Sequence, residues 1–122
     1  MNKKSSFLKN RLYSVKFAFN GVWRLISQEA SIQVQLTIAV FMTIAGFLCN
    51  LSPTEWIIQV LTIGLILVLE AVNTVIEEIA DFIHPEYHTK IGLIKDISAG
   101  AVFLMAITAV IVGVIIYFPK IF

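Results

Sequence analysis

Three long apolar stretches divide this chain, and polar residues gather at their ends. The stretches cover about residues 32–51, 53–83 and 97–118. Because a helix needs roughly 20 apolar residues to cross about 30 Å of hydrocarbon, the first and third stretches have the length of transmembrane helices. The second stretch is longer by about two to three turns, and its excess is polar. The pattern therefore predicts three membrane-spanning helices.

The segment before them, about residues 5–28, has a different pattern. Apolar side chains recur there at spacings of three and four, with basic residues among the others, and they are Phe7, Leu8, Leu12, Val15, Phe19, Val22 and Trp23. Such spacing predicts an amphipathic helix. A basic amphipathic helix with aromatic side chains is expected to lie on the membrane surface.

Local signals mark the ends of these elements. Ser52, Pro53 and Glu55 form a helix start, in which Ser52 caps the first turn and Glu55 completes a capping box. The first two spans are therefore a tight helical hairpin. Pro85 is expected to interrupt the second helix, and residues 84–96 are predicted to form a loop. Trp56, Trp23, Tyr117 and Phe118 are interpreted as anchors at the membrane interface.

Composition and charge set the class and the orientation. The chain has 122 residues, of which 58% are hydrophobic, so it is predicted to be a single all-α domain of an integral membrane protein, residues 1–122. Six of the nine Lys and Arg residues precede residue 25. The positive-inside rule therefore places the N-terminus in the cytoplasm, with three crossings. Lys90 and Lys95 agree with this orientation, and only Lys120 opposes it.

Ionisable residues converge at one depth. If hydrocarbon begins near Trp56, the helical rise puts Glu70 about 21 Å and Glu77 about 31 Å along the second span. Glu29 precedes the first span and Lys95 precedes the third, so all four lie near the cytoplasmic boundary. Ionisable groups in a membrane are costly, and their default interpretation is a functional site.

The acidic residues also share a face. Glu70, Asn73, Thr74, Glu77 and Asp81 fall within an arc of about 100° on the second span. Three carboxylates on one stripe repel one another unless a cation or a Lys or Arg side chain neutralises them, and such oxygen ligands suit Mg²⁺. The alternative is a solvated helix end whose acids only face water.

Residues 70–81 carry the pattern E-x-x-N-x-x-x-E-x-x-x-D, and two further segments follow at fixed distances. These are Glu86-Tyr87-His88 and Lys95-Asp96-Ile97-Ser98-Ala99-Gly100-Ala101. The combination resembles the small prokaryotic diacylglycerol kinase family, which includes undecaprenol kinases, over nearly the whole chain. The resemblance implies a membrane kinase that moves the γ-phosphoryl group of MgATP onto a lipid hydroxyl. It also implies a bacterial inner-membrane homotrimer with sites shared between subunits and a surface helix that helps to admit lipid.

The same resemblance assigns roles to residues. Glu70 would be the general base, supported by Asn73, and Glu29 and Glu77 would hold Mg²⁺. Nucleotide contacts would come from Arg11, Phe17, Glu29, Glu77, Glu86, Tyr87, His88, Lys95 and Asp96. Contacts to the lipid acceptor would come from Glu70, Trp56, Ser98 and Ala99. No nucleic-acid partner is expected.

The chain departs from the family pattern near its N-terminus and after Glu29. Asn10 and Phe17 stand where the family often has Arg and Tyr, with Arg11 as the nearest substitute, and Gln33 stands in a segment that is usually basic. Diacylglycerol is slightly favoured over undecaprenol as acceptor, on the Glu86-Tyr87-His88 match alone.

Two other functions remain as alternatives. A small oligomeric proton-coupled transporter would place its acid near the midplane of the membrane, whereas these acids lie at the rim. An inactive assembly subunit would have no need to keep so costly a polar set.

Overall fold

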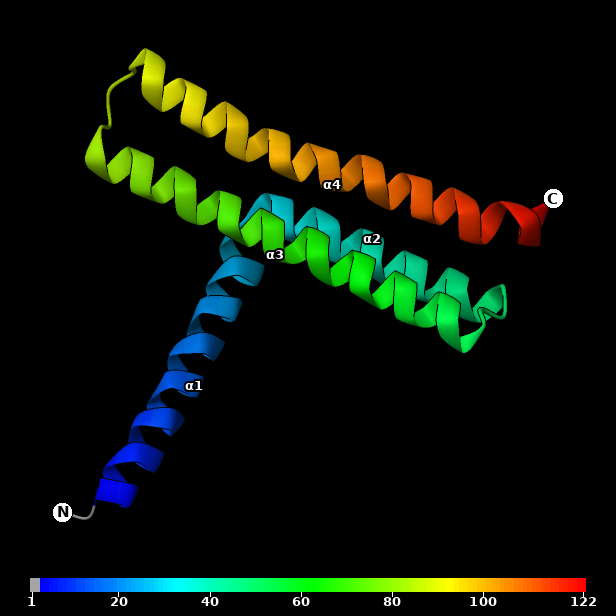
Figure 1. Ribbon diagram of the computed structural model, residues 1–122, viewed down its shortest axis with the longest axis horizontal. Helices are drawn as coiled ribbons and strands as arrows, with labels where there is room; N and C mark the ends of the chain where they lie inside the picture. Colours follow the sequence, from blue (N-terminus) through cyan, green and yellow to red (C-terminus); the bar gives the residue numbers. More distant parts are fainter. Residues whose placement is uncertain (1–2) are drawn as a thin grey trace.

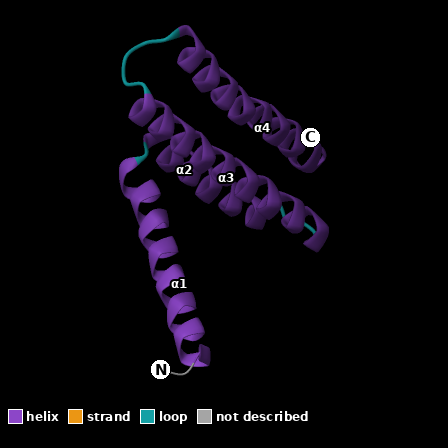
Figure 2. Ribbon diagram, turned by 60° about the vertical axis from the view of Figure 1, so that its left-hand side comes forward, coloured by secondary structure: helices purple, strands orange, loops and turns teal. Residues whose placement is uncertain are grey.

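Within residues 3–122, the part of the chain that the computed structural model describes, four helices account for nearly all residues. They are α1 (Lys3–Gln28), α2 (Ala30–Leu48), α3 (Pro53–Ile83) and α4 (Thr89–Ile121). Helices α2, α3 and α4 run alongside one another, and α1 leaves this bundle at a steep angle (Figures 1 and 2). The last three helices are long and apolar enough to cross a membrane. The predicted all-α membrane fold is confirmed.

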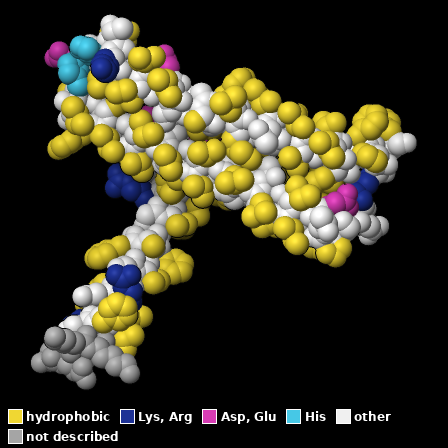
Figure 3. Space-filling view, in the orientation of Figure 1, with side chains coloured by type: hydrophobic (Ala, Val, Ile, Leu, Met, Phe, Trp, Pro, Cys, Tyr) yellow, Lys and Arg dark blue, Asp and Glu magenta, His cyan; other side chains and the backbone are white. Residues whose placement is uncertain are grey.

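Helix α3 is the centre of the bundle, because it packs against both α2 and α4, whereas α1 contacts α2 near the turn that joins them. Few side chains are buried within the described chain, and most large apolar side chains are exposed. Figure 3 shows hydrophobic side chains over the length of the bundle and charged ones gathered toward its two ends. This distribution is what a hydrocarbon environment favours.

The start of α3 follows the predicted capping box. The Ser52 hydroxyl accepts a hydrogen bond from the Glu55 N–H at 3.2 Å, and Glu55 Oε1 accepts one from the Ser52 N–H at 2.9 Å. Before it, Asn50 has a φ of 53°, a left-handed conformation that asparagine tolerates better than most residues. The turn also brings Trp56 onto Gly46, where an added Cβ would lie 2.6 Å from the indole ring. A glycine is therefore needed at this contact.

The predicted start of the last helix was wrong. Residues 89–96, expected in a loop, form the first two turns of α4. His88 begins the helix by accepting a hydrogen bond from the Lys90 N–H at its Nδ1 atom, 3.0 Å away. Hydropathy missed these turns because they contain Lys95 and Asp96, which helices accept readily outside the hydrocarbon. The first helix of the hairpin also ends three residues earlier than predicted, at Leu48.

Tyr117 does not act as an interfacial anchor, contrary to prediction. It is only 8% exposed, and its hydroxyl lies 2.6 Å from Gln59 Oε1 and 3.1 Å from the Met42 carbonyl oxygen. Lys120, the basic residue that opposed the predicted orientation, forms an ion pair with Glu55 at 3.0 Å. Its charge is therefore neutralised within the chain.

Candidate active site

A hydrogen-bonded network joins α3 to α4 at the end of the bundle next to the α3–α4 loop. The Ser98 hydroxyl donates to Asn73 Oδ1 at 2.7 Å, and Asn73 Nδ2 donates to Glu77 Oε1 at 3.2 Å. One turn further along α3, Asp81 forms an ion pair with Lys95 at 2.6 Å. Four residues predicted from the sequence to be functional are thereby brought together with Asp81.

The local sequence explains this arrangement. Asn73, Glu77 and Asp81 are four residues apart, so they stack along one side of α3. The additional turns at the start of α4 place Lys95 opposite Asp81, and they extend beyond the apolar segment 97–118. The hydrogen bond to Asp81 raises the pKa of the Lys95 ammonium above its ordinary value, and the charges of Asp81 and Glu77 act in the same direction. Lys95 therefore supplies the cation that this acidic stripe requires.

Glu70 lies at the inner end of the stripe and is only 7% exposed. The Thr74 hydroxyl donates to the Glu70 backbone carbonyl at 3.2 Å, so this bond engages the backbone of Glu70 and not its side chain. In the described part of the chain, no hydrogen bond or ion pair engages the Glu70 carboxylate. The residue is buried, but its carboxylate oxygens are not fully enclosed, since no fully buried side-chain oxygen of the described chain lacks a hydrogen-bond partner. An ionisable group near the edge of the hydrocarbon is costly, which favours a functional role for Glu70.

Glu29 lies on another side of α3. It occupies the position between α1 and α2, is half-buried and makes no capping hydrogen bond. Together with Arg24, Thr74 and Glu78 it lines a mainly apolar groove of about 800 Å³ between α1, α2 and α3. Glu77 does not line this groove. Residues 3–122 contain no group of three or more His, Cys, Asp or Glu side chains that could hold a metal ion.

The α3–α4 loop carries several of the expected nucleotide contacts. Tyr87 is 86% exposed, and its ring lies beside Gly92 in the first turn of α4. The His84 Nδ1 atom lies 2.7 Å from the Glu86 carbonyl oxygen, while His88 caps α4. Glu86 and Asp96 are both exposed. These side chains lie near the same end of the bundle as Lys95, and they are accessible to a soluble ligand.

Three expected contacts lie elsewhere. Arg11 and Phe17 are on α1, where the Arg11 guanidinium stands 5.6 Å over the Phe7 ring and Phe17 stacks on Tyr13 with ring centroids 6.5 Å apart. That helix leads away from the bundle (Figure 1). Trp56 packs on Phe47 at the opposite end of α3 from Glu70, about 21 Å along the axis. Ala99 is exposed next to Ser98.

Sequence reasoning missed the polar contact among Gln59, Tyr117 and the Met42 carbonyl. Gln59 is buried in α3, and its Nε2 donates to the Met42 oxygen at 3.0 Å. The available signal was an amide within an otherwise apolar span, because such a group must find a hydrogen-bond partner in hydrocarbon. The hydrogen-bond partners of Gln59 are distant in sequence, so the sequence pattern does not identify them.

Comparison with known proteins relates the chain to one family of kinases. The family model described as prokaryotic diacylglycerol kinase matches residues 16–117. The undecaprenol kinase of Bacillus subtilis is 35% identical over 98% of this chain and 94% of its own length. The diacylglycerol kinase of Synechocystis is 32% identical over 90% of this chain and 63% of its own length. The diacylglycerol kinase of Haemophilus influenzae is 24% identical over 94% of this chain and 98% of its own length.

The match covers α2 and α3 completely, the second half of α1 from residue 16, and α4 up to residue 117, so it spans the positions of Asn73, Glu77, Lys95 and Ser98. The three apolar helices agree with a protein that acts within a membrane. The chain therefore belongs to the prokaryotic diacylglycerol kinase family and is a membrane lipid kinase.

Proposed function

We propose that this chain transfers the γ-phosphoryl group of MgATP to the primary hydroxyl of a membrane lipid, with Glu70 as the general base. The observation that carries the proposal is Glu70, a residue only 7% exposed whose carboxylate has no hydrogen-bond or ion-pair partner in the described chain and which lies one turn from Asn73. A general base must reach the proton that it abstracts by a hydrogen bond. A lipid hydroxyl held at this depth meets that requirement.

The roles of the neighbouring residues follow from their contacts. Asn73 supports the acidic stripe, since Ser98 and Glu77 fix its amide from two sides. Lys95 contacts the nucleotide phosphates by exchanging the Asp81 carboxylate for phosphate oxygens. Phosphoryl transfer depends on positioning and on neutralising charge, and a lysine ammonium supplies both. Glu86, Tyr87, His88 and Asp96 contact the rest of the nucleotide from the exposed loop.

Mg²⁺ enters with ATP, and Glu77 and Glu29 would hold it. The donor set fits, because Mg²⁺ usually takes one or two protein carboxylates and completes its coordination with phosphate oxygens and water. The exposed Glu77 carboxylate suits this role better than a closed cluster of three acids would. When bound, the ion neutralises negative charge on the transferring phosphoryl group.

The complete site would form between copies of the chain, in a homotrimer. Glu29 and Glu77 lie on different sides of α3, and α1 holds Arg11 and Phe17 away from Lys95. A neighbouring copy would bring such groups together, and the exposed apolar surface of the bundle offers room for the contact. The N-terminus and the α3–α4 loop would face the cytoplasm of a bacterial inner membrane, where ATP is present.

Phosphate transfer from labelled MgATP in mixed micelles tests the proposal. Wild type, Glu70→Gln and the control Glu55→Gln would be assayed with diacylglycerol and undecaprenol as separate acceptors. The control removes a carboxylate at the far end of α3, where glutamine still suits a capping box. We expect label in one of the two lipids, lost in Glu70→Gln by about a hundredfold or more and retained in the control. Full activity of Glu70→Gln would exclude Glu70 as the base.

Two primary alcohols are the candidate acceptors, diacylglycerol and undecaprenol. The matching relatives include an undecaprenol kinase and two diacylglycerol kinases. The Glu86-Tyr87-His88 segment slightly favours diacylglycerol, while the undecaprenol kinase of Bacillus subtilis supports the other choice. The same assay separates the two.

A further inference from the structure

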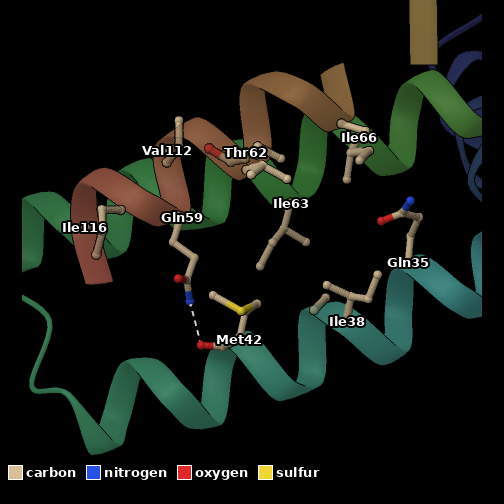
Figure 4. Close-up of a pocket in the computed structure, with 14 residues that line it drawn as sticks. Gln35, Ile38, Met42, Gln59, Thr62, Ile63, Ile66, Val112 and Ile116 are labelled. Atoms are coloured by element: carbon tan, nitrogen blue, oxygen red, sulfur yellow. Dashed lines mark hydrogen bonds between the residues drawn. The ribbon is translucent and has the colours of Figure 1, made fainter. Parts of the chain in front are cut away.

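A cavity of about 300 Å³ lies between α2, α3 and α4. Figure 4 shows its two ends, with Gln59 and Met42 at one and Gln35 and Ile66 at the other. Its walls are almost entirely apolar. No fully buried side-chain N or O atom of the described chain lacks a hydrogen-bond partner. Of the polar residues in the walls, Gln59 and Thr62 are hydrogen-bonded within the chain, and Gln35 lies at the Ile66 end. The cavity is suited to a hydrocarbon group.

The cavity is aligned with Glu70. Gln59, Ile63 and Ile66 line it from α3, and their spacing of four and three residues continues to Glu70, four residues further on. Residues with this spacing share one side of a helix. Glu70 therefore lies one turn beyond the Ile66 end of the cavity, on the same side of α3.

The opposite end is closed by the polar contact described above. Gln59 from α3 and Tyr117 from α4 both donate hydrogen bonds to the Met42 carbonyl oxygen of α2, and Gln59 Oε1 also accepts one from the Tyr117 hydroxyl. These hydrogen bonds connect the three helices at the same depth. A chain entering from the Glu70 end would stop there, about 16 Å along α3.

Small residues of α4 leave the cavity open. Ala109 and Gly113, two small residues one turn apart, both line it. A Cβ added at Gly113 would meet no heavy atom within 4 Å. The space beside Gly113 is therefore unfilled, and an empty apolar space forfeits the contacts that a hydrocarbon chain would restore.

We propose that this cavity binds one hydrocarbon chain of the acceptor lipid, and that Gln59 and Tyr117 limit the chain length that fits. The inference rests on the proposed role of Glu70, since the hydroxyl of the lipid must lie at that end. It commits to a lipid chain because a membrane lipid kinase must hold its acceptor by the apolar part while the hydroxyl meets the base. Neither Gln59 nor Tyr117 touches the reacting atoms, so both act as specificity-determining residues.

The test compares acceptors that differ only in chain length, such as dioctanoylglycerol and dioleoylglycerol, or a short and a long polyprenol. Gly113→Leu fills the cavity next to Val112 and Ile116, near its Gln59 end. We expect kcat/KM to fall at least about tenfold for the long acceptor and less than about threefold for the short one. Thr108→Leu, which enlarges an exposed position of α4, should leave both values within about twofold.

A second variant tests the closed end. Tyr117→Ala removes the largest side chain at the closed end of the cavity. We expect the ratio of kcat/KM for the long-chain acceptor to kcat/KM for the short-chain acceptor to rise at least about threefold. An equal fall in kcat/KM for the long and the short acceptor in Gly113→Leu would overturn the inference. If the oligomeric state of that variant also changed, the cavity would be filled by a second copy of the chain instead. The outcome is separate from that of Glu70→Gln, which should abolish transfer to acceptors of every length if the base is correctly assigned.

Discussion

The Ser98 hydroxyl donates a 2.7 Å hydrogen bond to Asn73 Oδ1, and both groups lie at the boundary between α3 and α4. This bond fixes which way the Asn73 amide points. With its oxygen held by Ser98, the amide turns its nitrogen toward Glu77, 3.2 Å away. A residue of α4 thus sets the orientation of two polar groups on α3, and Ser98 acts as a positioning residue for the acidic stripe.

Replacing Ser98 by alanine should therefore lower kcat while leaving the fold intact. The Asn73 oxygen would lose its donor, which costs about 1–3 kcal/mol for a buried group and corresponds to roughly a tenfold loss if it falls on the transition state. Steady-state kinetics with MgATP and the preferred lipid measure the change. Ser27→Ala, at an exposed serine of α1, is the control. An unchanged kcat in Ser98→Ala would show that Asn73 is oriented without Ser98.

Lys95→Met should raise KM for ATP by about tenfold, with a smaller effect on KM for the lipid. Lys95 is the cation paired to Asp81, and this hydrogen bond raises the pKa of the Lys95 ammonium above its ordinary value, so the charged form is favoured. Loss of one phosphate contact together with an unneutralised stripe weakens nucleotide binding. Lys90→Met provides a matched control, because Lys90 is an exposed lysine of the same helix start. Equal effects of the two substitutions would argue for a general charge effect instead.

Local signals were sufficient for α3. Ser52 and Pro53 mark its start, and Pro85 follows its last residues, so the predicted limits agree with the structure. The acidic stripe was also predictable, because the helical period alone places Glu70, Asn73 and Glu77 on one side. The need for a neutralising cation pointed to a lysine or arginine, and the ion pair of Lys95 with Asp81 meets it.

Contacts between distant residues were not predictable. Tyr117 and Met42 are 75 residues apart in sequence, and nothing near Tyr117 distinguishes a buried hydroxyl from an interfacial one. The start of α4 was missed because hydropathy measures affinity for hydrocarbon and not helix formation. The predicted pairing of Glu29 with Glu77 stays a prediction, since it concerns a metal ion and neighbouring copies.

Tyr117→Phe should destabilise the protein without changing its chemistry. The substitution removes the hydroxyl that bonds Gln59 and the Met42 carbonyl and keeps the ring. Hydrogen bonds between membrane helices contribute about 0.6 kcal/mol on average and up to about 1.7 kcal/mol. Thermal or denaturant unfolding in detergent measures the loss, with the exposed Tyr13 replaced by phenylalanine as control. Equal stability of Tyr117→Phe and Tyr13→Phe would show that the Tyr117 hydroxyl does not stabilise the bundle.

Ser52→Ala should destabilise the start of α3 while the ion pair between Glu55 and Lys120 remains. The Ser52 hydroxyl accepts from the Glu55 N–H, so alanine leaves that N–H without its acceptor. Loss of such a cap costs typically about 1 kcal/mol. Thr54→Ala changes a neighbouring exposed residue and serves as control. Unfolding in detergent should show a loss only in Ser52→Ala, and kcat should be unchanged because Glu70 lies about 27 Å further along the axis of α3. A fall in kcat equal to that of Ser98→Ala would mean that the two ends of α3 are coupled.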